Sequence, residues 1–147
     1  MAHSPVHLYN DMVRFEDIDA AAIVYHPTYL SYLERARSQI LFDLGYSFKR
    51  LLDEELGMVI ASADMKFIKP LYLENRFVVL SQIDDYGKSF FNITQALTTD
   101  MQNVTHGNLK SELRSIKNLH FYAHIKIVTI SRKTMRPTQC PLNLFRS

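Results

Sequence analysis

Apolar residues recur at intervals of three and four residues between Pro27 and Leu44. On an α-helix this spacing forms one apolar stripe, so the range is predicted to be a long amphipathic helix. Pro27 suits the first helical position, and Gly45 suits the position just after the last turn. The stripe of this helix comprises Tyr29, Leu30, Leu33, Ala36, Ile40, Leu41 and Leu44.

A shorter helix is predicted from Phe48 to Glu55, closed by Gly57, and after it the period of the apolar residues changes to two. Alternation of this kind is typical of half-buried strands. In the first such stretch, Val59 and Phe67 are expected to share one face with Ala61, Ala63 and Met65. The predicted strands are residues 7–15, 58–67, 76–83, 90–98 and 121–130.

Two connections differ in what their composition predicts. Residues Asp84 to Lys88 have turn composition, so strands 76–83 and 90–98 are predicted to form a hairpin. Residues 99–117 are polar, and we predict a long loop with one helical turn from Lys110 to Ile116. A loop of this length is either mobile or a surface for a partner.

The order of the elements predicts the fold class. A strand, a long helix and then successive strands indicate an α+β protein in which one helix packs on one face of an antiparallel sheet of five or six strands. A single helix cannot cover such a sheet completely. The exposed remainder and the open strand edges therefore predict self-association.

Composition narrows the class of protein. A chain of 147 residues supports one hydrophobic core, so a single domain over residues 1–147 is expected. The fractions of apolar residues (47%) and charged residues (22%) are those of an ordinary globular domain, and a net charge of +2 is too small to indicate nucleic acid as a partner. No apolar run approaches the roughly 20 residues that membrane insertion needs. The first ten residues lack the pattern of a secretion signal, so a cytoplasmic location is expected.

Cys140 is the only cysteine, which excludes an internal disulfide and a thiolate-rich metal site. It lies near the end of the sequence, between Gln139 and Pro141. No neighbouring residue in the sequence would lower its pKa, so a catalytic thiol is not expected there.

The sequence from residue 17 to residue 37, DIDAAAIVYHPTYLSYLERAR, places two acids and a histidine just before the long helix. Asp17 and Asp19 are explained equally well as turn-forming or capping residues, and His26 as a neighbour of the helix cap. By ligand type the three residues suit a metal, but no further ligand cluster accompanies them, so no metal site is expected. Spacing alone leaves these alternatives open.

The block from Asp17 to Tyr29 resembles the hotdog-fold acyl-CoA thioesterases. It is similar to the 4-hydroxybenzoyl-CoA thioesterase superfamily and, within it, to the YbgC-like branch that is associated with the Tol–Pal system. Residues 32–37, 63–70 and 132–137 give supporting matches. The resemblance implies a hotdog fold, and it implies a hydrolase that assembles as a homodimer or homotetramer and needs no bound cofactor and no metal.

The resemblance also implies roles in the reaction. Asp19 is the family's catalytic carboxylate, which acts on the thioester carbonyl as a nucleophile or as a base that activates water. The backbone N–H of His26, at the start of the long helix, is placed to stabilise the oxyanion. The His26 side chain adds a hydrogen bond, and Tyr25 helps to position it.

The resemblance gives the residues that contact the substrate less directly than it gives the catalytic roles. The acyl group is expected in a tunnel between the helix and the sheet of the facing subunit, with Ile23, Met58 and Ile60 among its contacts. Lys66 and Lys69 are expected near the phosphates of coenzyme A by their charge, although a solvated strand end explains them equally well. The cations Arg132, Lys133 and Arg136 are further candidates of the same kind. Whether the thiol carrier is coenzyme A or acyl carrier protein stays open.

Four residues qualify this interpretation. Arg37 falls inside the apolar stripe with Glu34 at its edge, which predicts a partly buried ion pair rather than a substrate contact. Ala22 stands where the family usually carries a glycine, which puts the substrate range in doubt. Met135 likewise replaces a turn glycine.

Two rival functions were weighed. Hotdog dehydratases also act on acyl-CoA, but their catalytic Asp and His are about five residues apart in a different block, whereas Asp19 and His26 are seven apart. A non-catalytic binding or scaffold protein of the Tol–Pal envelope system is the other alternative. Release of free thiol from acyl-CoA distinguishes the enzyme from the scaffold.

Overall fold

Five strands form one antiparallel sheet in the order β1-β3-β4-β5-β2. The computed structural model describes residues 4–102 and 107–141. The α+β class and the long helix on a five-stranded sheet, both predicted from the sequence, are confirmed. The elements in chain order are β1 His7–Met12, the 3-10 turn η1 Phe15–Asp17, α1 His26–Asp43, α2 Phe48–Asp53, β2 Leu56–Phe67, β3 Arg76–Tyr86, β4 Phe90–Thr98, α3 Leu109–Glu112, the 3-10 turn η2 Leu113–Ser115, and β5 Leu119–Ser131.

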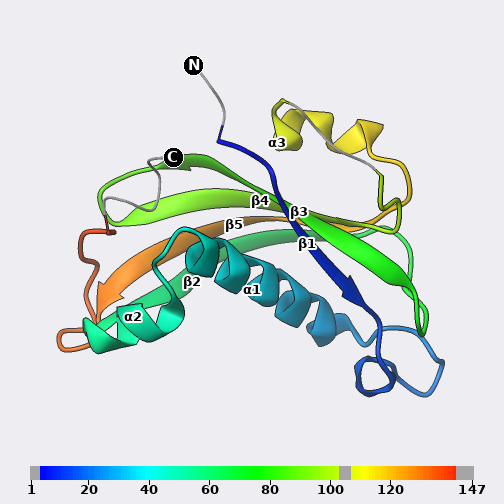
Figure 1. The fold of residues 1–147 in the computed structure, drawn as a ribbon, viewed down its shortest axis with the longest axis horizontal. Coiled ribbons are helices and arrows are strands. Elements are labelled where there is room, and N and C mark those ends of the chain that lie inside the picture. Colours follow the sequence, from blue (N-terminus) through cyan, green and yellow to red (C-terminus); the bar gives the residue numbers. More distant parts are fainter. Residues whose placement is uncertain (1–3, 103–106, 142–147) are drawn as a thin grey trace.

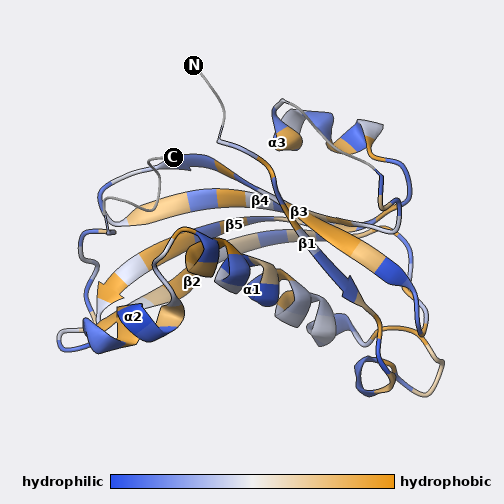
Figure 2. Ribbon diagram, in the orientation of Figure 1, coloured by the Kyte–Doolittle hydropathy of each residue, from blue (hydrophilic) through white to orange (hydrophobic). Residues whose placement is uncertain are grey.

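The sheet curves around α1, which lies along its concave face, while α3 lies on the opposite face (Figure 1). Hydrophobic residues concentrate in the strands (Figure 2). The main core is therefore the layer between α1 and the sheet, where Tyr32 and Leu33 of α1 meet Phe77 of β3 and Phe121 of β5, all fully buried. Burial of these large side chains is the principal force that holds the helix in place.

The boundaries of α1 agree with the sequence prediction to within one residue. Tyr25 is the residue before the first turn, Pro27 lies in that turn, and Gly45 leaves the helix with a φ of +79°. The prediction that Gly57 closes the next helix is wrong. Glu55 adopts the left-handed conformation after α2, with a φ of +59°, and Gly57 already pairs with Ile130 inside β2.

Strand β2 departs from the predicted alternation. A bulge between Ile60 and Ser62 shifts its register against β5. Because one extra residue reverses the facing of a strand, Val59 lies on the face opposite Phe67 and not on the same one, as predicted. Met58 and Ile60 consequently point to the α1 side, opposite Thr129 and Ile127.

The predicted hairpin of β3 and β4 is confirmed, but its turn is shorter than predicted. Strand β3 continues to Tyr86, so Asp84 and Asp85 belong to the strand, with a bulge between Ile83 and Asp85. Asp84 lies at this bulge, so both acidic residues are accommodated within the strand. Only residues 87–89 connect the two strands.

The connection from β4 to β5 contains the predicted helical turn, as α3 and η2. Leu109, Leu113 and Ile116 pack on Val78 and Leu80 of β3 as a second hydrophobic cluster. Residues 103–106 of the predicted loop lie outside the described residues. The segment formed by α3 and η2 therefore covers part of the sheet face that α1 leaves open.

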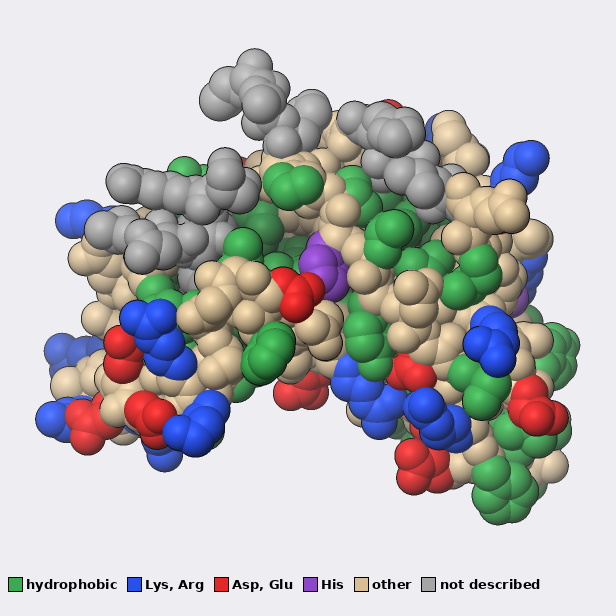
Figure 3. Space-filling view, in the orientation of Figure 1, with side chains coloured by type: hydrophobic (Ala, Val, Ile, Leu, Met, Phe, Trp, Pro, Cys, Tyr) green, Lys and Arg blue, Asp and Glu red, His purple; other side chains and the backbone are tan. Residues whose placement is uncertain are grey.

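Charged side chains of both signs lie next to one another over the α2 end of the molecule (Figure 3). Among them, Lys49 pairs with Asp53 at 3.0 Å, and Lys133 pairs with Glu55 at 2.9 Å. These pairs are exposed, so each contributes at most about 1 kcal/mol to stability.

Candidate active site

The two acids and the histidine are carried by a tight hairpin that leads into α1. Ile18 and Val24 pair across it, and the amide of Asp19 donates to the carbonyl of Ile23 at 2.9 Å. At its base the amide of Tyr25 donates to the carbonyl of Asp17 at 3.0 Å. The hairpin thus brings Tyr25, the residue before α1, back beside Asp17.

Asp17 is a structural residue. It is buried, and its Oδ2 accepts hydrogen bonds from the amide of Arg14 at 2.9 Å and from the hydroxyl of Tyr32 at 2.8 Å. The carboxylate therefore caps the 3-10 turn η1, of which Asp17 is the last residue, and ties the hairpin to α1. The turn-forming and capping alternative stated for this residue describes it correctly.

Asp19 lies at the tip of the hairpin and is exposed. Its Oδ1 accepts a hydrogen bond from the amide of Ala21 at 2.8 Å, which fixes the carboxylate. Within the described part of the chain, no hydrogen bond joins Asp19 to His26. One protomer therefore holds the carboxylate in place but does not remove it from solvent.

The start of α1 is open to solvent. The side chain of Tyr25 makes no capping hydrogen bond, and no acidic residue lies in the first turn. The first amides of a helix have no partner within it and carry partial positive charge, so this end favours an anion. The exposed His26 ring contacts the ring of Phe67 edge to face, with centroids 4.9 Å apart. Tyr25 is 58% exposed.

Ala22 and Met135 both adopt the left-handed conformation, with φ of +63° and +59°. Both were identified from the sequence as replacements of family glycines. The structure supplies a conformational reason for glycine at the two positions, because a Cβ is strained at positive φ.

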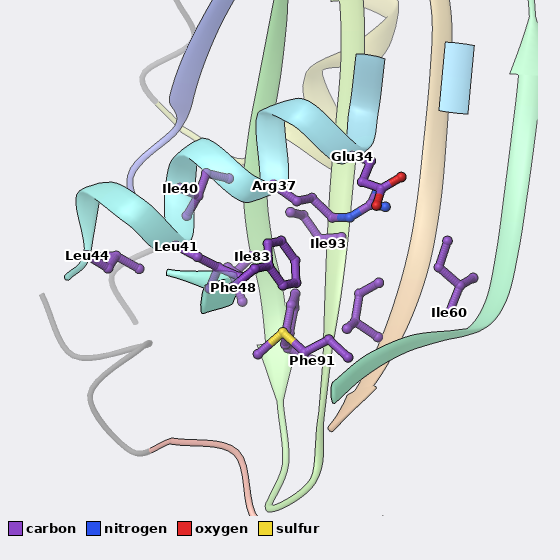
Figure 4. A pocket seen from close by; sticks show the side chains of 12 residues that line it. Glu34, Arg37, Ile40, Leu41, Leu44, Phe48, Ile60, Ile83, Phe91 and Ile93 are labelled. Atoms are coloured by element: carbon purple, nitrogen blue, oxygen red, sulfur yellow. The ribbon is translucent and has the colours of Figure 1, made fainter. Parts of the chain in front are cut away.

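A cavity of about 170 Å³ lies between α1, α2 and the sheet (Figure 4). Met58 and Ile60, the residues expected from the sequence to contact the acyl group, both line it. Most of its other lining is aliphatic or aromatic. These residues are Ile40, Leu41, Leu44, Phe48, Ile83, Phe91, Ile93 and Ile127.

Arg37 and Glu34 project from α1 into one end of the cavity (Figure 4). Burial lowers the pKa of the Arg37 guanidinium, and the nearby Glu34 charge opposes that shift. The predicted ion pair is not formed by direct contact. Arg37 instead donates through Nη1 to Oε1 of Gln95 at 2.9 Å.

Gln95 was missed by the sequence analysis. It is fully buried in β4, and its Nε2 donates to the carbonyl of Leu33 at 3.1 Å and to the hydroxyl of Ser81 at 3.0 Å. These bonds hold the amide so that its oxygen meets Arg37. The sequence gives no clear signal for Gln95, because the strand also carries Asn92, Thr94 and Thr98 and its pattern does not reveal which side chain meets Arg37.

The remaining sequence candidates are separated by the fold. Ile23 is half-buried and forms an isolated bridge with Tyr72, next to Asp19. Lys66 and Lys69 lie at the far end of β2 and do not line the cavity. Arg132 and Lys133 follow β5 at the opposite end of the same pair of strands.

Cys140 is buried, and its Sγ lies 2.7 Å from the hydroxyl of Thr129. Burial raises the pKa of the thiol, which disfavours the reactive thiolate. Cys140 is therefore a core residue.

Strand β2 is an edge of the sheet and carries exposed apolar side chains. Ile60, Met65 and Phe67 are 47%, 38% and 45% exposed, and they project on the side of α1. An open edge with apolar residues is a template for pairing with another chain.

The described residues contain no group of three or more His, Cys, Asp or Glu side chains arranged to hold a metal ion. They also contain no helix with the length and hydropathy that crossing a bilayer requires.

Comparison with known proteins gives three kinds of match. A family model described as the thioesterase-like superfamily matches residues 13–141. The chain is 32% identical over 136 residues to an acyl-CoA thioesterase YbgC from Helicobacter pylori, covering 91% of this chain and 92% of that protein. A solved 1,4-dihydroxy-2-naphthoyl-CoA thioesterase from Synechocystis superposes with a TM-score of 0.78 at 16% identity, over 94% of this chain and 91% of that one. A Staphylococcus aureus protein in complex with CoA superposes with a TM-score of 0.76 at 16% identity, over 98% of this chain and 82% of that one.

Proposed function

Since the chain belongs to the thioesterase-like superfamily, we propose that it hydrolyses acyl-CoA thioesters to the free acid and CoA, with Asp19 as the catalytic carboxylate. The hairpin before α1 carries this proposal. It fixes the Asp19 carboxylate through the amide of Ala21 and leads directly into the uncapped, electropositive start of α1. A thioester carbonyl between the two meets an attacking oxygen on one side and an N–H donor on the other.

The chemistry has two routes. In the first, an oxygen of Asp19 bonds to the carbonyl carbon, the C–S bond breaks and the thiolate leaves; water then hydrolyses the mixed anhydride and restores the carboxylate. In the second, Asp19 takes a proton from water, the hydroxide adds to the carbon, and the proton passes to the departing sulfur. Both routes place negative charge on the carbonyl oxygen, which the His26 amide stabilises.

A second copy of the chain completes the site. Two β2 edges related by a twofold axis pair antiparallel. The Phe67 end of one copy, with His26 beside it, then lies next to the Met58 and Ile60 end of the other copy. The exposed Asp19 of one protomer is thereby brought towards the acyl cavity of its partner and shielded from water. This homodimer, alone or as half of a homotetramer, is the proposed unit of activity.

The cavity indicates the size of the acyl group. An apolar cavity of about 150 Å³ is sufficient to hold a benzene molecule. The cavity beside α1 is of the same size and has similar lining residues. We therefore expect a short aliphatic or single-ring acyl group rather than a long fatty acyl chain.

Thiol release from a panel of acyl-CoA compounds tests the proposal. Wild-type protein is expected to release thiol, and Asp19→Asn is expected to lose about a hundredfold or more in kcat/KM because the attacking oxygen or base is removed. Glu16→Gln is the matched control, since it removes an exposed carboxylate three residues away. Absence of thiol release from every acyl-CoA, from short aliphatic to aromatic, contradicts the enzyme and favours the scaffold alternative. The Tol–Pal association, the single domain and the cytoplasmic location stay predictions of the sequence.

A further inference from the structure

A groove on the face of the sheet opposite α1 has cationic side chains on both of its walls. Lys66 and Lys69 come from the end of β2 and the residues after it, while Lys110 and Arg114 come from α3 and η2 across the groove. The groove encloses about 750 Å³, within the usual range of ligand sites.

The wall formed by α3 is held firmly against the sheet. Oε1 of Gln82 accepts a hydrogen bond from the amide of Leu109 at 2.7 Å, and its Nε2 donates to the carbonyl of Gly107 at 2.9 Å. The hydroxyl of Thr98 donates to the carbonyl of Lys117 at 2.6 Å. With the apolar contacts of Leu109 and Leu113 beneath it, the wall has a fixed position.

The charges of the groove are not balanced by its own lining, which includes no carboxylate. Among the described residues, Lys66, Lys110 and Arg114 form no ion pair, and Lys69 donates only to the amide oxygen of Asn118 at 3.2 Å. Asp64 is the cross-strand neighbour of His124, and with Asp84 and Asp85 it lines an adjoining pocket that Lys110 also borders, so the positive region ends there. Four like charges around one groove repel each other, so an anion between them is stabilised.

The floor of the groove suits a flat, partly apolar group. The rings of Tyr122 and His124 are neighbours, with centroids 5.6 Å apart and planes tilted by 58°, and both side chains are half-buried, so a planar group stacks on one ring and meets the other at an angle. Leu119 adds an aliphatic surface next to them. A planar base stacks favourably on an aromatic side chain of this kind.

We propose that this groove binds an organic phosphate, with the phosphate groups between Lys66 and Lys69 on one wall and Lys110 and Arg114 on the other, and a planar base on Tyr122. Lys66 lies on the face of β2 opposite Phe67, so the site is separate from the acyl cavity. The ligand is a free nucleotide, or the nucleotide end of coenzyme A reaching round the end of β2. The second source rests on the proposed function, whereas the first does not.

Calorimetric titration of the full chain with ATP and with ADP tests the site without any hydrolysis. Wild-type protein is expected to bind, more weakly at 200 mM than at 50 mM NaCl because salt screens the charges. The double variant Lys110→Ala/Arg114→Ala is expected to bind at least tenfold more weakly. Lys49→Ala/Lys88→Ala is the control, since it removes the same charge from exposed positions outside the groove and should bind within twofold of wild type. No binding by wild-type protein, or equal losses in the two double variants, overturns the proposal.

Kinetics then identifies the source of the phosphate. If the groove holds the nucleotide end of coenzyme A, Lys110→Ala/Arg114→Ala raises KM for acyl-CoA at least fivefold but leaves KM for an acyl thioester of N-acetylcysteamine, which has no nucleotide, unchanged. If the ligand is a free nucleotide, both KM values stay unchanged while ATP binding is lost. A lack of hydrolysis with intact ATP binding contradicts only the proposed function.

Discussion

Two carboxylates that are two residues apart in the sequence, Asp17 and Asp19, have different environments. Asp17 is buried and its Oδ2 accepts hydrogen bonds from the amide of Arg14 and the hydroxyl of Tyr32, whereas Asp19 is exposed at the hairpin tip with a single amide donor. In a regular extended strand these two side chains would share one face, because side chains two residues apart point the same way. Asp17 instead ends the 3-10 turn η1 and turns its carboxylate towards Tyr32 of α1, whereas Asp19 lies in the hairpin that follows and accepts from the amide of Ala21. The different environments of the two acids follow from this change of backbone conformation.

Replacement of Ala22 by glycine is expected to stabilise the protein. The left-handed conformation costs a residue with a Cβ roughly 1–2 kcal/mol, which exceeds the roughly 0.4–1 kcal/mol by which glycine favours the unfolded chain. The net gain of up to about 1 kcal/mol raises the melting temperature of a chain of this length by about 2–4 °C. Thermal unfolding followed by circular dichroism measures it.

Ala21→Gly is the control for this prediction, since Ala21 adjoins Ala22 and does not have a positive φ. It should leave the melting temperature unchanged or lower it. A lower melting temperature for Ala22→Gly than for Ala21→Gly contradicts strain at residue 22.

At the scale of elements, α1 is joined to the hairpin by a buried hydrogen bond. The Tyr32 hydroxyl reaches Asp17 from one turn and a half inside the helix, and burial together with that carboxylate raises the pKa of the phenol. The bond sets where the helix starts relative to Asp19, so a structural residue pair defines the geometry of the proposed active site.

Tyr32→Phe is expected to destabilise the fold by about 1.5–3 kcal/mol, because a buried carboxylate loses one of its donors. Chemical denaturation measures the loss. Tyr46→Phe is the matched control: Tyr46 is also buried, but its hydroxyl forms no hydrogen bond with the described residues, so its free energy of unfolding should change by less than about 0.5 kcal/mol. Equal effects of the two substitutions contradict this account.

At the scale of the whole molecule, the open edge of β2 leaves apolar side chains uncovered in a single chain. The apolar side chains of that edge project on the α1 side of the sheet, and in the proposed homodimer a twofold-related copy covers both them and the exposed Asp19. Assembly and activity are therefore expected to fail together.

Met65→Glu is expected to convert the protein to single chains and to reduce thiol release at least tenfold, because a charge on the paired edge is costly to bury. Light scattering gives the mass, and the thiol assay gives the activity. Leu8→Glu places the same charge on the exposed edge strand at the other side of the sheet and should leave both unchanged. If the wild-type protein is a single chain in solution and is still active, the proposal that two protomers share the active site is contradicted.

The sequence by itself determined the elements, because helix and strand periods are local. The stripe from Pro27 to Leu44 located α1 to within one residue, and alternation located the strands of the sheet. It also located the block of two acids and a histidine before the helix and the two residues, Ala22 and Met135, that stand where glycine is usual. Each of these signals lies within a few residues of the feature that it predicts.

Only the tertiary structure decided which distant residues meet. The bulge in β2 places Val59 on the face opposite to the predicted one. Arg37 forms a hydrogen bond with Gln95, which is 58 residues away in the sequence. Lys110 and Lys66 line the same groove. Contacts of this kind depend on strand order and register, which a local pattern does not contain. The physical reason is that burial and charge act through space, and only the packed fold sets the distances in space between residues far apart in the chain.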